Sequence, residues 1–277
     1  MAVTAQDVNK LRQMTGAGMM DCKKALTETN GDFDSAIDLL RKMGQKVSTS
    51  RADRQTNEGS IFIKTNSDET EGILVGLGCE TDFVAMNEEF QKLGNMIADL
   101  AIENKPSSVD ELKSLNAGET TVSEKITELV GKIGEKLEIV AYHSISGEKI
   151  IPYTHAGSKL GVLVALKGTN GADVTKPGKD IAMQIAAMNP IAVDKDDIDQ
   201  SVINRELEIG REQAKSEGKP ENIIDKIAEG KLNKFFKENT LLNQPFVKDN
   251  SQTVKSYLDT VNKGLTVDSF KRVSIGG

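Results

Sequence analysis

The sequence predicts an α+β protein, with short helices first, antiparallel sheets in the middle and a helical hairpin late in the chain. Three observations support this class. Apolar residues recur with helical spacing over residues 1–45, and two β-rich runs, residues 61–77 and 150–166, are each followed by an amphipathic helix. A highly charged segment, residues 194–237, carries two apolar stripes separated by a Gly-Lys-Pro reversal. Helices that cover one face of antiparallel sheets are typical of the α+β class.

The first predicted unit, residues 1–45, is a module of three helices. Gly16 and Gly18 break the chain after the first helix, and Asp32 is a suitable N-cap for the third. The residues with inward-facing helical spacing are Val8, Leu11, Cys22, Ala25, Leu26, Ala36, Ile37 and Leu40. Because three short helices bury little apolar surface, we expect the module to pack on a larger neighbour or to bind a partner.

A polar linker, residues 46–58, is expected to join this module to a first core subdomain, residues 59–136. Short strands are predicted at residues 61–63 and 72–77, with a polar turn between them. The helix that follows carries its apolar residues at helical spacing, namely Phe90, Leu93, Ile97 and Leu100.

A second core subdomain, residues 137–193, repeats this β-β-α pattern. Its strands are predicted at residues 150–153 and 160–166. The following helix aligns Ile181, Ile185 and Met188. Two units of similar size and order indicate an internal duplication with an antiparallel sheet in each half.

The charged segment, residues 194–237, predicts an inserted antiparallel helical hairpin that projects from the core. Its two apolar stripes contain Ile203, Leu207 and Ala214, and Ile224, Ile227 and Phe235. Residues 238–277 then return the chain to the second core subdomain, through apolar stretches at residues 241–247 and 267–275.

Composition favours a cytosolic protein that does not bind nucleic acid or membranes. The formal net charge of the 277 residues is −7, whereas nucleic-acid binders usually carry a basic face. Cys22 and Cys79 lie too far apart in sequence to suggest a metal site, and two cysteines do not make a disulfide framework. The first ten residues lack a secretory signal, and no apolar run approaches the roughly 20 residues of a membrane span.

A search for catalytic or metal-binding motifs is negative. The only histidines, His143 and His155, have no metal-ligand spacing around them. The nearest approach to a phosphate-binding loop fails twice, because Asp173 stands where the first glycine is needed and Asp180 where the hydroxyl is needed. The many carboxylates are best interpreted as solvated helix faces. We therefore expect no enzyme activity, no metal and no cofactor.

The most informative stretch is Cys79-Glu80-Thr81-Asp82-Phe83-Val84, between a buried strand and a helix. One interpretation folds Phe83 under the sheet as part of the core. The other presents Phe83 as an apolar plug for a partner's crevice.

The corner from Thr15 to Asp21 poses a similar choice. Met19 and Met20 are adjacent on a glycine-flanked turn, so both cannot face one small core. Methionine adapts well to binding surfaces. The pair is expected either to contact a partner or to pack on the larger part of the protein.

Together these stretches resemble elongation factor Ts of bacterial-type translation. The similar residues occur in the family's order through nearly the whole chain. They are L-R-x-x-T-G-A-G-M-M-D-C-K-K-A-L at residues 11–26, C-E-T-D-F-V-A at residues 79–85, His155 with K-L-G-V at residues 159–162, and Q-P-F-V at residues 244–247.

The resemblance implies a ubiquitin-associated-like first module, a duplicated core and an inserted hairpin. It also implies a guanine-nucleotide exchange factor that binds the GTPase elongation factor Tu, both GDP-bound and nucleotide-free. By similarity, the residues that displace Mg²⁺ from the partner are Thr81, Asp82, Phe83 and Val84. The residues implied to contact the partner elsewhere are Arg12, Met19, Met20 and His155.

Two other functions remain open at this point. An adaptor of the ubiquitin-associated type would need only the first module and would leave the Thr81–Val84 segment without a purpose. An RNA-binding translation protein is disfavoured by the acidic balance. Exposure of both Phe83 and the Met19-Met20 pair would favour the exchange factor.

Overall fold

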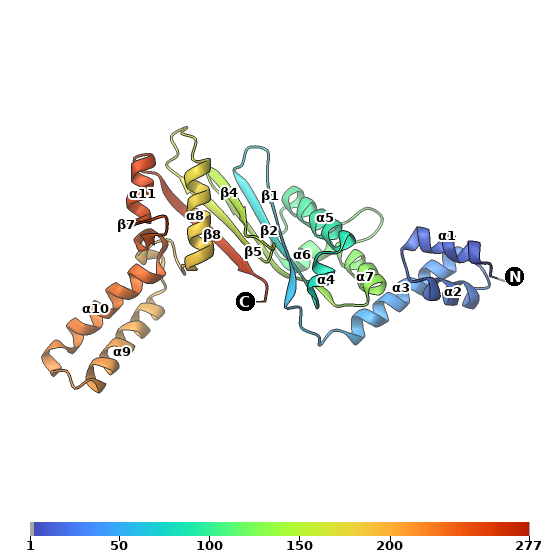
Figure 1. Ribbon diagram of the computed structural model, residues 1–277, viewed down its shortest axis with the longest axis horizontal. Coiled ribbons are helices and arrows are strands. Elements are labelled where there is room, and N and C mark those ends of the chain that lie inside the picture. The colour runs from blue at the N-terminus through green and yellow to red at the C-terminus, as the bar shows by residue number, and fades with distance from the viewer. Residues whose placement is uncertain (1–2, 277) are drawn as a thin grey trace.

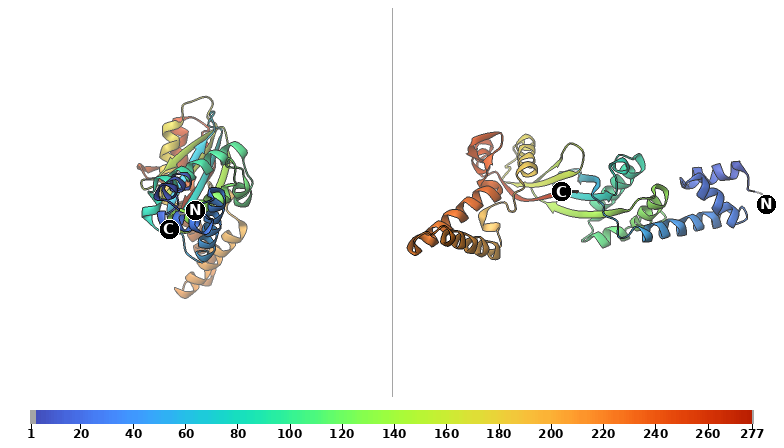
Figure 2. Two further views of the ribbon diagram at one scale, coloured as in Figure 1. Left: turned by 90° about the vertical axis from the view of Figure 1, so that its right-hand side faces the viewer. Right: turned by 60° about the horizontal axis from the view of Figure 1, so that its bottom comes forward.

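The computed structural model describes residues 3–276 and is elongated (Figures 1 and 2). The helices α1 to α3 form one end, two sheets with their covering helices form the middle, and the hairpin of α9 and α10 forms the other end. This is a mixed helix and sheet protein with antiparallel sheets, as predicted. Residues 1, 2 and 277, which the first and last predicted segments include, lie outside the described residues.

The first three helices are α1 (Ala5–Thr15), α2 (Met19–Glu28) and α3 (Phe33–Ser50). Thr4 caps α1 in a capping box with Asp7, and Gly16 ends the helix at a φ of 68°. The six residues buried in their shared core are Val8, Leu11, Cys22, Ala25, Leu26 and Ala36. Because α3 continues to Ser50, the first part of the expected linker, residues 46–58, is helical.

The first sheet has the order β1 (Glu58–Thr65), β2 (Glu71–Cys79) and β3 (Leu137–Ser146), all antiparallel. Helices α5 (Glu88–Asn104) and α7 (Val122–Ile133), with the short α6 (Val109–Ser114), share its apolar core. The sequence interpretation included neither β3 nor α7. Since β3 pairs with β2, residues 137–146 belong to the first sheet, so the subdomain boundary expected at residue 137 is wrong.

The second sheet has the order β4 (Lys149–Thr154), β5 (Leu160–Lys167) and β8 (Thr266–Ser274). Helix α8 (Thr175–Met188) packs on it, and α11 (Val254–Val261) joins the same core. Met188, expected to face inward, is 43% exposed because it is the last residue of α8, before the left-handed cap Asn189. The two sheets meet through a separate apolar cluster that includes Ile61 and Leu163.

The predicted hairpin is present as α9 (Gln200–Ser216) and α10 (Glu221–Asn239), which reverse at Gly218. A Cβ on Gly210 would lie 3.0 Å from the Cα of Ala228, so a glycine lets the two helices approach closely. The short elements at its base are η1 (Lys195–Asp197), η2 (Leu241–Asn243), β6 (Pro245–Phe246) and β7 (Asp249–Thr253). None of the helices in residues 3–276 has the length and apolar character to cross a bilayer.

Candidate functional site

A single helical turn, α4 (Asp82–Ala85), follows β2 directly and presents an aromatic side chain to solvent. Phe83 is 78% exposed, so the structure favours the second interpretation, in which this ring is presented rather than folded into the core. Val84 and Ala85, on the opposite side of the turn, are buried in the core of the first sheet. The turn therefore has an anchored face and a free face.

Met86 extends the free face of this turn. It is 71% exposed and lies three residues after Phe83, a spacing that places both side chains on one side of a helical turn. The sequence analysis did not select Met86. In the sequence, Met86 could be recognised only by its position three residues after Phe83. That spacing becomes informative only when Phe83 is known to be exposed.

Hydrogen bonds from other elements hold the turn at its start. Thr81 accepts a bond from the Val84 N–H at 3.4 Å as the N-cap of α4. The Glu135 carboxylate accepts the Thr81 N–H at 3.0 Å and the Thr81 hydroxyl at 2.8 Å. Glu80 accepts the Lys136 N–H at 2.7 Å and an Arg51 guanidinium N–H at 2.8 Å.

The cysteine beside the turn acts as a hydrogen-bond donor. The Cys79 thiol donates to the Thr81 carbonyl oxygen at 3.1 Å. Burial, together with the charges of Glu135 and Glu58, raises the pKa of Cys79 to about 12. The thiol therefore stays protonated and structural at neutral pH, which excludes a reactive thiolate at this position.

Asp82, the remaining residue of the predicted segment, is exposed on the first turn of α4. Within residues 3–276 its carboxylate makes no ion pair. Across the same part of the chain, no group of three or more His, Cys, Asp or Glu side chains is arranged to hold a metal ion. The side chains of this site present charge and apolar surface outward.

The corner between α1 and α2 is the second exposed apolar feature. Met19 is 50% and Met20 73% exposed, so neither is packed away against the larger part of the protein. Arg12 and Met14, on the last turn of α1, are exposed beside them. Gly16 ends α1 and Gly18 precedes α2, so Met19 and Met20 are the first two residues of α2.

Lys132 of α7 connects this corner to the neighbourhood of α4. A Cβ on Gly16 would lie 2.6 Å from the Lys132 Nζ, so the ammonium group lies directly over the corner. The same Nζ is 3.6 Å from a Glu89 carboxylate oxygen in the first turn of α5, the helix that follows α4. A cavity of about 440 Å³ opens next to this contact, between the first three helices and α7.

His155 lies apart from both features, on the turn between β4 and β5. Its ring is exposed, and its Nδ1 shares a hydrogen bond of 2.8 Å with the Tyr153 hydroxyl. The turn is joined to the first sheet by a bond of 2.7 Å from the Ile61 N–H to the Ser158 carbonyl. The candidate residues thus lie on three separate elements. Thr81 to Val84 form the turn at α4, and the methionine corner is linked to the start of α5 through Lys132. His155 lies on the turn between β4 and β5.

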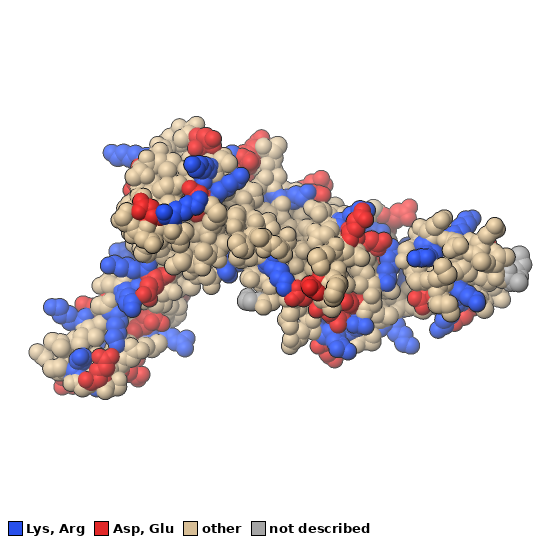
Figure 3. All heavy atoms as spheres, in the orientation of Figure 1, with Lys and Arg blue, Asp and Glu red and all other residues tan. Residues whose placement is uncertain are grey.

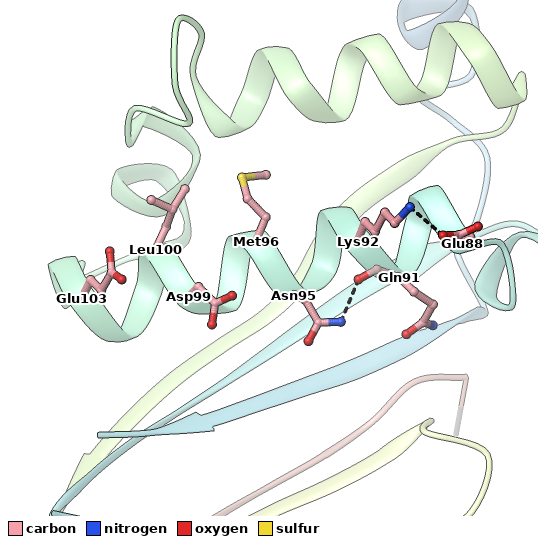
Figure 4. A pocket seen from close by; sticks show the side chains of 8 residues that line it. All are labelled: Glu88, Gln91, Lys92, Asn95, Met96, Asp99, Leu100 and Glu103. Carbon is pink, nitrogen blue, oxygen red and sulfur yellow. Dashed lines mark hydrogen bonds and ion pairs between the residues drawn. The ribbon is translucent and has the colours of Figure 1, made fainter. Parts of the chain in front are cut away.

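A shallow hollow on the outer face of α5 offers no comparable site. All of its lining residues come from this one helix, and Lys92 is paired with Glu88 at 2.6 Å (Figure 4). Gln91 points from this face toward the sheet, and it donates to Ser60 of β1 and to Ala85 of α4. On the visible face of the whole molecule, basic and acidic side chains are interspersed (Figure 3).

Comparison with known proteins finds relatives over the whole chain. The sequence model of the family described as "Elongation factor TS" matches residues 80–277. The chain is 58% identical to a protein of Amoebophilus asiaticus over all of both chains, and 54% identical to one of Cytophaga hutchinsonii over 99% of each. It is 48% identical to one of Porphyromonas gingivalis, again over 99% of each. Each of these relatives carries the name "Elongation factor Ts".

Proposed function

The chain belongs to the elongation factor Ts family of translation factors, and we propose that it is a guanine-nucleotide exchange factor for the GTPase elongation factor Tu. In this proposal it binds elongation factor Tu with GDP, displaces the Mg²⁺ bound with that nucleotide and promotes GDP release. It works in the cytoplasm during elongation, and it makes or breaks no covalent bond.

One observation carries the proposal. Phe83 is 78% exposed on a turn whose opposite face is buried in the core. Full burial of such a side chain in a partner would stabilise the complex by roughly 1.5–3 kcal/mol. Met86, 71% exposed on the same side of the turn, extends the ring into an apolar patch that a partner's crevice would bury.

The mechanism follows from how GTPases hold GDP. Backbone N–H groups of a phosphate loop, a lysine and Mg²⁺ compensate the charge of the phosphates. A wedge formed by Phe83 and Met86, with the Asp82 carboxylate beside it, favours a partner conformation in which the Mg²⁺ site is opened. The factor weakens GDP binding by the same ratio that GDP weakens factor binding. Only contacts that differ between the two conformations of the partner produce this effect.

The other surfaces contribute affinity. Arg12, Met19 and Met20 contact a helix of elongation factor Tu, and His155 lies against its phosphate-binding loop. The first module is a docking piece of the ubiquitin-associated type. The two sheet halves, which derive from an internal duplication, carry the wedge and His155 at separate points on the partner. The hairpin of α9 and α10 is an insertion in the second half.

The test is stopped-flow release of a fluorescent GDP analogue from elongation factor Tu, with and without this protein. Acceleration that saturates with protein concentration supports an exchange factor. Binding without acceleration would instead identify an adaptor that only tethers the GTPase.

A further inference from the structure

The wedge sits on an element that is too short to hold itself in place. Helix α4 has four residues, and isolated helices of that length are not stable in water. Its orientation therefore depends on the burial of Val84 and Ala85 in the core and on hydrogen bonds from side chains outside the turn. The surrounding contacts show which side chains make these bonds.

The start of α4 is held by a reciprocal pair of glutamates. Glu135 accepts the N–H and hydroxyl of Thr81, the residue after Glu80. Glu80 in turn accepts the N–H of Lys136, the residue after Glu135. Each carboxylate thus binds the backbone next to the other, which locks the strand end that leads into α4 against the connection from α7 to β3. Charged acceptors make these bonds stronger than neutral ones.

The end of α7 determines the direction in which the Glu135 side chain points. Gly134 ends that helix at a φ of 79°, a left-handed conformation that L side chains rarely adopt. The residue that follows is therefore directed back toward Thr81. The other end of α4 is held by Gln91, whose Nε2 donates to the Ala85 carbonyl at 2.7 Å and to the Ser60 hydroxyl at 2.9 Å.

We propose that Glu135 is a positioning residue for nucleotide exchange, which fixes the orientation of the turn that carries Phe83 and Met86. This inference rests on the proposed exchange function. A wedge that samples several orientations is competent only for the fraction of time it points correctly, so its effect on the partner falls by that fraction. Because the other surfaces already hold the factor on the partner, the cost of ordering a loose turn falls on the exchange step within the complex.

The test compares Glu135→Ala with Glu135→Gln in stopped-flow GDP release at increasing factor concentrations. Alanine removes both bonds to Thr81, so the maximum release rate should fall about tenfold, while the concentration at half-maximum changes little. Glutamine keeps an acceptor for the Thr81 N–H and should recover most of the rate. Glu119→Ala, at an exposed position in the loop before α7, is the matched control and should retain the wild-type rate.

The possible outcomes separate this inference from the proposed function. If the wild-type protein fails to accelerate GDP release, both the proposed function and this inference are wrong. If wild type accelerates release and Glu135→Ala matches its maximum rate, only the inference is overturned. Should Glu135→Ala not fold, Glu135→Leu keeps most of the side-chain volume and removes both bonds to Thr81. An unchanged maximum rate in that folded variant would equally overturn the inference.

Discussion

The turn at α4 and the corner between α1 and α2 both expose apolar side chains, but they are built in opposite ways. Phe83 is a rigid ring on a turn whose start donates hydrogen bonds to Glu135 and whose end accepts one from Gln91. Met19 and Met20 carry flexible side chains at the start of α2, after the glycines Gly16 and Gly18. A rigid projection can impose a shape on a partner, whereas an adaptable one follows the partner's shape. Under the proposed function, this difference would give the turn the role of distorting the partner and the corner the role of adding affinity.

Their attachment to the protein differs as well. The turn grows directly out of β2 and packs into the core of the first sheet. The corner reaches that sheet mainly through α3, which crosses α7 where Gly44 meets Gly131. A Cβ on Gly131 would lie 2.9 Å from the Cα of Gly44, so the two helix backbones touch there. The position of the corner therefore depends on this crossing and on the contact of Lys132 with the corner at Gly16.

The largest expected effect concerns stability and compares two phenylalanines near the turn. Phe90 is fully buried whereas Phe83 is 78% exposed. Phe90→Ala should lower the free energy of unfolding by about 3–5 kcal/mol through loss of core packing. Phe83→Ala should change it by less than about 0.5 kcal/mol. Urea unfolding measures both, and similar losses in the two variants would show that the turn is part of the core.

The next effect concerns affinity. Deleting residues 1–43 removes the corner and should weaken binding to elongation factor Tu at least about tenfold, a loss of ~1.4 kcal/mol. The maximum rate of GDP release should fall much less, because the wedge remains. Titration calorimetry and stopped-flow release measure the two quantities separately. If the shortened protein folds and binds elongation factor Tu with unchanged affinity, the first module has no docking role.

The smallest expected effect is a pH-dependent change in stability. It tests the hydrogen bonds that Glu80 and Glu135 make at the start of the turn. Burial raises the pKa of Glu80, but bonds from the Lys136 N–H and Arg51 outweigh it and hold the pKa below its ordinary value of 4.5. A lowered folded-state pKa stabilises the fold at pH values above 4.5, and this contribution is lost as the pH falls through the folded-state pKa.

Glu80→Gln should therefore be less stable than wild type by about 1 kcal/mol at neutral pH. The difference should close as the pH is lowered below the folded-state pKa of Glu80. Urea unfolding at a series of pH values measures it. A difference that does not change with pH would mean that the charge of Glu80 contributes nothing.

Much of the fold could be predicted because its elements carry local signals. The three N-terminal helices, the two hairpins of strands and the helical hairpin all show clear periodicity or turn residues. Helix α7 was predictable too, since Thr121 and Glu124 form a capping box ahead of an apolar stripe. Strand β3 was harder to predict because it is only partly buried and lacks a clean alternation of apolar and polar residues.

The candidate site could be selected from the sequence, but the orientation of its side chains could not be predicted. The segment from Thr81 to Val84 stood out between a strand and a helix, yet whether Phe83 faced inward depended on contacts distant in sequence. Thr81 donates to Glu135, which lies 54 positions away in the chain. No local sequence pattern predicts a contact over that distance. The roles of Glu80, Glu135 and Gln91 therefore emerged only from the three-dimensional structure.

The most direct test of the account is GDP release from elongation factor Tu at saturating concentrations of Phe83→Ala, with the urea unfolding midpoint measured on the same preparation. The account predicts a maximum rate lowered at least about tenfold, with the midpoint unchanged. A maximum rate equal to that of wild type would contradict the wedge. A loss of rate matched by a loss of stability would show that Phe83 acts through folding instead.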